Sequence, residues 1–394
     1  MEKKCVVVGV TSSVAAFKAV QLVSDLLKLN LDVEVIMTKN ATEFITPLQF
    51  SSLTKHQTYV DTFARVADYK VEHISLAKKA DAFIIAPATA NVIAKVVNGL
   101  ADDMLTTTFL AATCPKIIAP AMNTAMYDNP ITQANLNKAR EYGIEVVEPT
   151  SGLLACGDSG RGKLADIDSL IATILKALET NKILSGKHVL VSAGPTQEAL
   201  DPVRYISNHS SGKMGYEIAR AAYNMGAEVT LVSGPTNLKL PYGVKVINIK
   251  SAQDMFDAIT SIYDAQDYVI KAAAVADFRP ASVNDNKIKK QGSSTMEVNL
   301  VSNPDILKYL GEHKTHQKIC GFAMETQDVK ENAYKKFKSK NCDMLVVNDL
   351  FKKGAGFKGD TNVVSIFSHD KVEDLELMSK KDLAKVILEK LVEA

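Results

Sequence analysis

The chain has 394 residues, of which 46% are apolar and 23% are charged. Because domains average roughly 150 residues, this length predicts two domains, and the composition predicts that the whole chain folds. The 46 lysines and arginines nearly balance the 45 aspartates and glutamates. This balance excludes a protein drawn to nucleic acid or to an anionic membrane by its overall charge, so any site for an anion must be local.

The five cysteines are widely spaced and include no Cys-x-x-Cys pair. This pattern argues against both a disulfide framework and a zinc cluster. The apolar run near the N-terminus is much shorter than a signal-peptide core or a membrane span of ~20 residues. We therefore expect a cytoplasmic protein without a membrane or nucleic-acid partner.

Short apolar runs alternate with amphipathic helical stretches in the first half of the chain. Strands are expected at residues 5–10, 32–38, 82–88, 116–121 and 144–148. Such alternation is typical of a parallel sheet covered by helices on both faces. A polar break at 181–187 follows a helical stretch at 167–179, and we place the domain boundary between residues 184 and 185.

The second half repeats the pattern without an internal repeat that aligns with the first. Strands are expected at 188–193, 228–233, 245–249, 268–273, 318–323 and 344–348. This predicts a second α/β domain. The lysine-rich, glycine-containing segment 351–360 is expected to be either a mobile loop or a solvated turn.

Small and hydroxyl-bearing residues follow several of the first strands. Segment 9–16 reads GVTSSVAA, 86–91 reads APATAN and 119–127 reads APAMNTAMY, while Thr38 ends another strand. Ligands of open α/β sheets gather at these strand ends, and the start of a helix can bind phosphate. The glycine spacing is not G-x-G-x-x-G, and each segment could equally be an N-cap or a tight turn.

These segments, together with VEHISL and GLLACGDSGRGK, resemble the homo-oligomeric flavin-containing cysteine decarboxylase family over nearly all of residues 1–180. The resemblance implies FMN bound by Ser12, Ser13, Thr38, Thr89 and Asn91. It also implies that His73, Asn123 and Cys156 act on the substrate. From the residues alone, His73 could cap or pack a helix, Asn123 could hold a turn and Cys156 could be an inert thiol.

The family chemistry gives these residues their implied roles. A cysteine carboxylate has no carbonyl placed to accept the electrons that departing carbon dioxide leaves, and FMN creates this sink by oxidising the thiol. Asn123 would hold the substrate carboxylate, His73 would be a positioned acid or base, and Cys156 would donate a proton from a closing segment at 152–163. Lys163 and Tyr127 stand where the family commonly has Arg and Trp, which alters the contacts of that segment.

The second half carries a long motif before a helix, GPTQEALDPVRYISNHSSGKMG at 194–215. Its end could cradle phosphates, although it is not a Walker A sequence, and a flexible loop is the alternative. With AAAVADF, KIKK, NPDI and GFAMET in this order, it resembles the phosphopantothenate-cysteine ligase family over residues 190–394. Bacterial members use CTP to form an acyl-cytidylate, from which cysteine displaces CMP, and Mg²⁺ and lysines would meet the charge on the phosphates.

The ligase resemblance implies a set of CTP contacts: Ala273, Asp277, Lys287, Asn303, Pro304, Asp305, Ile306, Phe322, Lys336 and Lys340. Lys287 would also act in catalysis, and Asn208 would hold the acyl-cytidylate. From the residues alone, Lys287 could belong to a solvated lysine cluster and Asp277 could be an N-cap. The ligands of Mg²⁺ are not identified.

The two resemblances together predict a bifunctional enzyme of coenzyme A biosynthesis. It would ligate cysteine to 4'-phosphopantothenate and then decarboxylate 4'-phosphopantothenoylcysteine to 4'-phosphopantetheine. The implied fold is α/β, with a flavodoxin-like or Rossmann-like FMN domain at 1–184 and a Rossmann-like ligase domain at 185–394. The implied assembly is a homo-oligomer of trimeric decarboxylase units and dimeric ligase units, up to a dodecamer.

Three other functions are compatible with the first half alone. A prenyl-flavin synthase or a peptide cysteine decarboxylase would share the flavin fold, but neither accounts for the second half. A regulatory protein that binds phosphatases belongs to the same flavoprotein family. The joint presence of His73, Asn123 and Cys156 beside a complete ligase half argues against it.

Overall fold

The structure is a computed structural model that describes residues 3–63, 71–153, 157, 159–289, 296–325, 329–349, 359–369 and 371–394. The chain divides into two compact units, Met1–Thr180 and Asn181–Ala394. Across the described residues, no helix is both long enough and apolar enough to cross a membrane.

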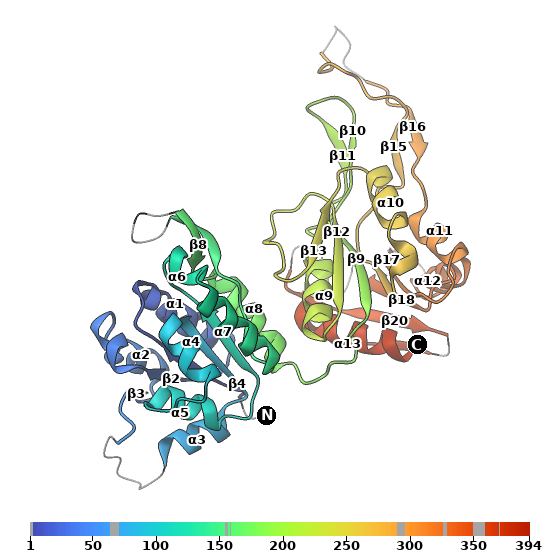
Figure 1. Cartoon of the computed structure of the whole chain (residues 1–394). Helices are drawn as coiled ribbons and strands as arrows, with labels where there is room; N and C mark the ends of the chain where they lie inside the picture. The colour runs from blue at the N-terminus through green and yellow to red at the C-terminus, as the bar shows by residue number, and fades with distance from the viewer. Residues whose placement is uncertain are drawn as a thin grey trace. The chain divides into compact units, whose positions relative to one another are not determined.

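A parallel six-stranded sheet forms the centre of the first unit (Figure 1). Its order is β3-β2-β1-β4-β5-β6. The strands are β1 (Cys5–Val10), β2 (Asp32–Met37), β3 (Thr58–Tyr59), β4 (Ala82–Ala88), β5 (Lys116–Pro120) and β6 (Glu145–Val146). This is the order of a Rossmann fold, in which sheet growth reverses between β1 and β4. The expected parallel sheet is confirmed, although β6 is shorter than the expected strand and β3 is an addition.

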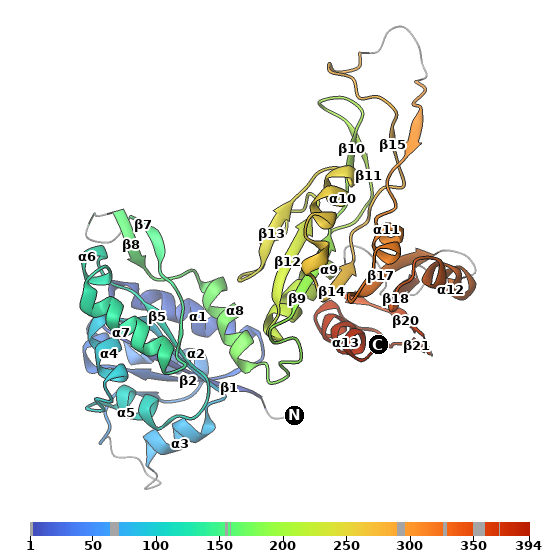
Figure 2. The same ribbon diagram turned by 45° about the vertical axis from the view of Figure 1, so that its right-hand side comes forward.

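Helices cover both faces of this sheet (Figure 2). One face packs against α1 (Phe17–Lys28), α2 (Pro47–Thr54) and α8 (Ile167–Leu178), and the other against α3 (Glu72–Lys79), α4 (Ala90–Val97), α5 (Met104–Ala111) and α7 (Pro130–Glu141). Successive residues of a strand point to opposite faces, so a strand covered on both sides is apolar throughout. Accordingly, every residue of β1 and β4 is buried.

Short elements follow the carboxyl ends of the strands in the first unit. They are the 3-10 helices η1 (Val14–Ala16) and η2 (Lys39–Glu43), the helix α6 (Thr124–Tyr127), and an antiparallel hairpin of β7 (Thr150–Leu153) and β8 (Ser159–Lys163). The hairpin corresponds to the segment expected to close over substrate. The sequence did not indicate that this segment begins and ends in paired strands.

The second unit contains an eight-stranded sheet in the order β13-β12-β9-β14-β17-β18-β20-β21. Its strands are β9 (His188–Ala193), β12 (Glu228–Ser233), β13 (Lys245–Asn248), β14 (Tyr268–Lys271), β17 (Lys318–Glu325), β18 (Met344–Asp349), β20 (Val364–Ser368) and β21 (Val372–Asp374). The first six are parallel, as expected, and the last two are an antiparallel edge that the sequence does not reveal.

Helices also cover both faces of the second sheet. One face packs against α9 (Lys213–Asn224) and α13 (Lys380–Glu393), and the other against α10 (Ala252–Thr260), the 3-10 helix η3 (Tyr263–Ala265), α11 (Ile306–Glu312) and α12 (Val329–Ser339). The sheet therefore has the two covered faces that a doubly wound fold requires.

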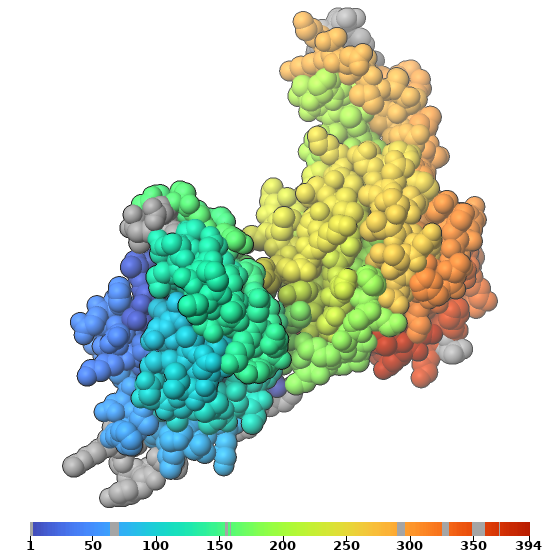
Figure 3. Space-filling model, viewed as in Figure 1, coloured from blue at the N-terminus to red at the C-terminus, as the bar shows by residue number. Residues whose placement is uncertain are grey.

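Two thin hairpins project from the body of the second unit (Figures 2 and 3). One pairs β10 (Gln197–Ala199) with β11 (Tyr205–Ser207), and the other pairs β15 (Phe278–Pro280) with β16 (Leu300–Ser302). A further small pair joins β19 (Thr361–Asn362) to β22 (Met378–Ser379). Most of the lysine-rich segment 351–360 lies outside the described residues.

Candidate functional site

The five residues assigned to FMN follow the carboxyl ends of three strands around the β1–β4 switch point. They are Ser12 and Ser13 after β1, Thr38 after β2, and Thr89 and Asn91 after β4. Ser13 and Thr89 are also N-caps of η1 and α4, respectively. The N-cap role that the sequence left open is therefore present at these two positions, and it does not exclude a contact with a ligand.

A buried hydroxyl joins the loops on the two sides of the switch point. The Oγ1 atom of Thr11 donates to the carbonyl oxygen of Pro87 at 2.7 Å and accepts from the backbone N–H of Thr89 at 3.1 Å. Thr38, in contrast, is 8% exposed, and its Oγ1 atom has no hydrogen-bond partner among the described residues. Leaving such a group unpaired costs about 1–3 kcal/mol, so a ligand bound at this edge could supply its partner.

The proposed substrate residues of the first unit have different local settings. His73 is the second residue of α3 and is half-buried. Asn123 is the N-cap of α6, where its Oδ1 atom accepts from the backbone N–H of Ala125 at 2.8 Å. Cys156 lies between β7 and β8, outside the described residues.

The β7–β8 hairpin sits directly on the loop that precedes α6. The backbone N–H of Met122 donates to the carbonyl oxygen of Gly162 at 3.0 Å. A Cβ atom on Gly162, whose φ is +129°, would lie 2.3 Å from the Met122 carbonyl oxygen, and one on Gly160 would lie 2.5 Å from Thr124 Oγ1. Only glycine permits such close contacts at these two positions, so Gly160 and Gly162 allow the hairpin to pack against the segment around Met122 and Thr124.

Tyr127, a departure from the family pattern, braces this hairpin. It is 2% exposed, and its hydroxyl donates to Glu148 Oε2 at 2.6 Å. Arg161 from β8 lies over its ring at 5.6 Å and forms an ion pair with Asp128 at 3.1 Å. Burial and the Glu148 carboxylate raise the pKa of Tyr127 to about 12, so its ring stays neutral. Lys163, the other departure, is exposed at the end of β8.

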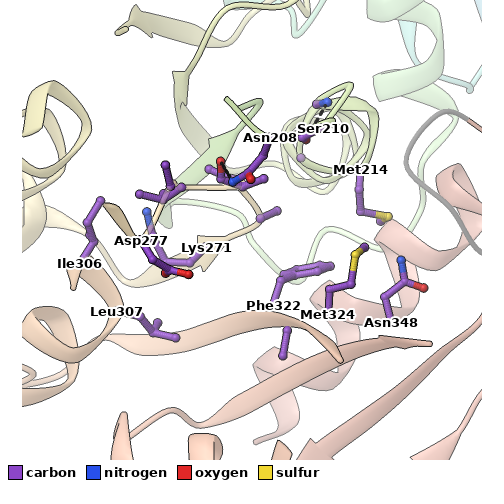
Figure 4. Close-up of a pocket in the computed structure, with 18 of the residues that line it drawn as sticks. Asn208, Ser210, Met214, Lys271, Asp277, Ile306, Leu307, Phe322, Met324 and Asn348 are labelled. Carbon is purple, nitrogen blue, oxygen red and sulfur yellow. Dashed lines mark hydrogen bonds between the residues drawn. The ribbon is translucent and has the colours of Figure 1, made fainter. Parts of the chain in front are cut away.

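A pocket of about 860 Å³ opens at the carboxyl edge of the second sheet (Figure 4). Its size lies within the ~300–1,000 Å³ that small-molecule sites occupy. The pocket is lined by ten of the residues that the sequence assigns to the ligase: Asn208, Ala273, Asp277, Asn303, Pro304, Asp305, Ile306, Phe322, Lys336 and Lys340. These residues come from five separate parts of the chain, and Figure 4 shows Asn208, Asp277 and Phe322 on different walls.

Lys287 differs from the other residues that the sequence assigns to the ligase. In the single chain that the structure contains, it does not line the pocket. It is exposed, and the neighbouring residue Ile288 is held from both sides. Asp201 Oδ2 accepts from the Ile288 backbone N–H at 3.1 Å, and Arg204 Nη2 donates to the Ile288 carbonyl oxygen at 3.0 Å. The structure thus anchors the segment next to Lys287 without bringing Lys287 to the other ligase residues.

Hydrogen bonds hold the loop after β14 in a defined shape along the pocket. The Ala274 carbonyl oxygen accepts from Asn208 Nδ2 at 3.1 Å. Asn303 Nδ2 donates to the Ala276 carbonyl oxygen at 2.8 Å, and the Asn303 backbone N–H donates to the Asp277 carbonyl oxygen at 2.8 Å. Asn208 and Asn303 therefore clamp this loop, in addition to the ligand contacts that the sequence assigns to them.

The start of α9 forms another wall, and two glycines allow it to approach the sheet. Gly212 has a φ of +77°, and a Cβ atom there would lie 2.8 Å from Thr236 Cγ2. A Cβ atom on Gly215 would lie 2.6 Å from Ala193 Cβ. The first N–H groups of α9 thus lie at the pocket, and a helix N-terminus favours anions.

The described residues that line the pocket include five lysines and two carboxylates: Lys213, Lys271, Lys336, Lys340, Lys380, Asp277 and Asp305. Burial raises the pKa of the Asp305 carboxyl, but hydrogen bonds from Lys340 and from the Lys308 backbone N–H outweigh it and hold this pKa below its usual value. Lys213 pairs with Asp360 at 2.7 Å. Lysines in excess of carboxylates favour a polyanionic ligand.

Lys271 is a pocket residue that the sequence does not single out. It ends β14, is 6% exposed, and its ammonium contacts the sulfur of Met255 at 3.5 Å. Burial lowers the pKa of Lys271 to about 7, against a smaller opposing effect of Asp305. The sequence does contain one indication of this residue, a lysine at the end of an otherwise apolar strand. Lys380, 4% exposed at the start of α13, has no such signal, because only folding brings that helix to the pocket.

Two Rossmann-type units with polar carboxyl edges, one of them carrying a cationic pocket, define a two-unit α/β protein of the doubly wound class. Residues 1–179 match the family model described as Flavoprotein. Residues 184–394 match the model described as DNA/pantothenate metabolism flavoprotein C-terminal domain. The two matches leave residues 180–183 between them, and the structure divides into its two units after Thr180.

Curated relatives match both units at once. The chain is 48% identical to the coenzyme A biosynthesis bifunctional protein CoaBC of Bacillus subtilis, covering 99% of this chain and 97% of that protein. It is 40% identical to the protein of the same name from Escherichia coli, with the same coverages of 99% and 97%. The chain belongs to the family of coenzyme A biosynthesis bifunctional proteins, and it is a bifunctional enzyme of that pathway.

A solved structure also resembles part of the chain. The crystal structure of the C-terminal domain of a coenzyme A biosynthesis bifunctional protein CoaBC is 44% identical, with a TM-score of 0.47. The match covers 54% of this chain and 97% of the chain in that structure.

Proposed function

We propose that residues 185–394 join cysteine to 4'-phosphopantothenate at the expense of CTP, and that residues 1–184 decarboxylate the product with FMN. The full-length similarity to bifunctional coenzyme A biosynthesis proteins supports both activities. The observation that carries the ligase assignment is the gathering of ten ligase-motif residues around one cationic pocket. Residues distant in the chain would not meet there by chance.

In the ligase, cationic side chains and backbone N–H groups of the pocket would neutralise the negative charge of the triphosphate. Lys336 and Lys340, together with the N–H groups at the start of α9, would hold phosphate oxygens, and Mg²⁺ would share this task. Asn208, fixed by the Ala274 carbonyl oxygen, would keep the acyl-cytidylate in place until cysteine arrives. Asn303 would shape the loop beside the base and ribose.

In the decarboxylase, the residues fit a flavin at the carboxyl edge of the first sheet, because the buried Thr38 hydroxyl there has no hydrogen-bond partner among the described residues. Bound FMN would supply the oxidation and the later reduction that decarboxylation of a cysteine requires. Asn123, oriented through the Ala125 N–H, would hold the substrate carboxylate. His73 would move a proton, and Cys156 would donate one from the segment between β7 and β8. We further propose a cytoplasmic homo-oligomer of trimeric decarboxylase and dimeric ligase units.

The overall proposal is tested by supplying 4'-phosphopantothenate, cysteine and either CTP or ATP to the purified protein. We expect pyrophosphate, CMP and carbon dioxide with CTP, and 4'-phosphopantetheine as the final product. A protein that forms no 4'-phosphopantothenoylcysteine with either nucleotide would contradict the ligase assignment. Release of carbon dioxide from added 4'-phosphopantothenoylcysteine tests the decarboxylase separately.

The purified protein should be yellow, with the absorption spectrum of a bound flavin that is released as FMN. Thr38→Val should lower the FMN content, because it removes a hydroxyl whose partner in the complex would be the ligand. Flavin absorbance per chain measures this, with circular dichroism as the check on folding. The flavin assignment fails if the protein is colourless and cannot be reconstituted with FMN.

Cys156→Ser should release carbon dioxide but make little 4'-phosphopantetheine. A thiol has a pKa near 8.5, whereas a serine hydroxyl is a far weaker acid and a poor proton donor at neutral pH. An enethiol product should therefore accumulate and be visible by mass spectrometry. Cys114→Ser, at a half-buried cysteine outside the motifs, is the control. Normal 4'-phosphopantetheine output from Cys156→Ser would remove this thiol from the mechanism.

A further inference from the structure

Three potential metal ligands meet at the amino edge of the first sheet, at the end of β2 opposite Thr38. Asp32 and Glu34 come from β2, and His56 follows α2. The Nδ1 atom of His56 lies 3.1 Å from Glu34 Oε1 and 3.7 Å from Asp32 Oδ1. None of these residues belongs to the motifs that carry the proposed function.

The spacing of these atoms suits one small cation. Zinc binds nitrogen and oxygen ligands at about 2.0–2.2 Å, so two ligands at the corners of a tetrahedron lie about 3.4 Å apart. The two measured separations of 3.1 and 3.7 Å lie on either side of this value. The ligand atoms of all three side chains lie within 4.8 Å of one another, so small side-chain movements would bring them around one ion.

Two buried atoms of the cluster are unsatisfied among the described residues. Glu34 is only 4% exposed, and its Oε2 atom has no hydrogen-bond partner. The Nδ1 atom of His56 is also buried without a hydrogen-bond partner, although it is directed at the carboxylates. A buried carboxylate is costly unless its oxygen atoms have partners. Lys79 and His56 contact only Oε1 of Glu34, so among the described residues the Oε2 atom remains available to a bound cation.

Lys79 shows that this position attracts positive charge. Its ammonium lies 2.9 Å from Asp32 Oδ2 and also pairs with Glu34 Oε1. One ammonium leaves the two carboxylates with a net negative charge when the imidazole is neutral. The Lys79 side chain is 43% exposed, so it can turn to solvent and vacate the cluster.

We propose that Asp32, Glu34 and His56 bind a divalent transition-metal ion of the Zn²⁺ type, for which the Lys79 ammonium is a built-in competitor. An imidazole beside carboxylates suits Zn²⁺, whereas Mg²⁺ prefers oxygen ligands and retains its waters. The ion would tie the start of β2 to the turn after α2. This site is separate from both proposed reactions and stands whether or not they are correct.

The test is Zn²⁺ binding to the full-length protein after removal of metal with a chelator, in buffer containing excess Mg²⁺. Calorimetry and metal analysis should show one Zn²⁺ per chain that is bound less tightly by His56→Gln. We expect His56→Gln and Asp32→Asn each to weaken binding by about tenfold or more. Both changes are at partly exposed side chains, and circular dichroism verifies folding.

Lys79→Gln gives the sharper result, because it should tighten Zn²⁺ binding by removing the competing ammonium. If Zn²⁺ bound elsewhere on the protein, this substitution would leave its affinity unchanged. The matched control is His188→Gln, since His188 also lies near two carboxylates, 3.3 Å from Glu228 and 3.8 Å from Asp267, but is 49% exposed. Equal Zn²⁺ binding by the wild type and His56→Gln, or weaker binding by Lys79→Gln, would overturn the proposal.

Discussion

Lys287→Gln should stop the ligase before pyrophosphate is released, lowering the rate of that step by about 10²-fold or more. Attack of the pantothenate carboxylate on CTP builds charge on the phosphates, and a positioned cation typically contributes ~3 kcal/mol to such a transition state. Glutamine keeps most of the length of the side chain but carries no charge. Pyrophosphate release in a single turnover measures the step directly.

Asn208→Asp should fail one step later in the same reaction. Asn208 donates to the Ala274 carbonyl oxygen at 3.1 Å, and an aspartate would lose this donor and repel the anionic acyl-cytidylate. The variant should still consume CTP but make little 4'-phosphopantothenoylcysteine, and the intermediate should be trappable by mass. Formation of the cytidylate by Lys287→Gln at the normal rate, or its absence in Asn208→Asp, would show that the two roles are wrongly assigned.

The exposed position of Lys287 makes its control important. Lys289 lies two residues further along the same segment and is also exposed. Lys289→Gln should therefore keep most of the activity, because the ligase resemblance assigns a role to the first lysine of the cluster only. A loss as large as that of Lys287→Gln would mean that the segment acts through its total charge. In one chain Lys287 lies outside the pocket, so its role requires movement of this segment or a second copy of the chain.

Lys271→Met should stabilise the second unit at pH 7 by up to about 5 kcal/mol, the free energy that corresponds to the shift of this pKa from 10.5 to about 7. Burial disfavours the charged form in the folded state. Between these two pH values the unfolded chain binds more protons than the folded one, so wild-type stability rises with pH. Below about pH 7 the folded protein bears the full free-energy cost of burying a charged Lys271. Above the unfolded-state pKa of 10.5 this cost is absent.

The gain from Lys271→Met should therefore shrink as the pH rises from 7 to 10. Hydrogen exchange of the β14 amides, followed by mass spectrometry in the full-length protein, measures this difference locally. Lys245→Met, at an exposed lysine that begins β13, is the control and should change stability little at any pH. A constant difference between wild type and Lys271→Met across this range would contradict the titration of a buried amine.

If the pocket binds CTP as proposed, Lys271→Met should also weaken CTP binding, and this would account for a destabilising residue in the pocket. A triphosphate bound nearby would favour the charged form of the amine, so the buried cation would be stabilised only in the complex. Binding sites commonly retain groups that lower stability for this reason. Calorimetric titration with CTP at pH 7 measures the loss.

Much of the fold could be predicted from local sequence, because buried parallel strands are apolar at every position. The residues of β1 and β4 illustrate this, and the expected six parallel strands of the second sheet are all present. The antiparallel edge formed by β20 and β21 was not predictable in the same way. Those strands are short and partly exposed, and β21 is exposed at all three positions, so neither has the continuous apolar run that marks a central strand.

The sequence by itself determined the family, the two α/β units and ten of the residues that line the pocket, because motif residues such as Asn208 and Asp277 lie in segments whose order and spacing are distinctive. Only the tertiary structure decided which side chains share an environment. It placed Lys271 at the pocket and left Lys287 outside it. It also brought His56 to the carboxylates of β2. Burial and charge depend on packing between segments distant in the chain, and local sequence does not specify that packing.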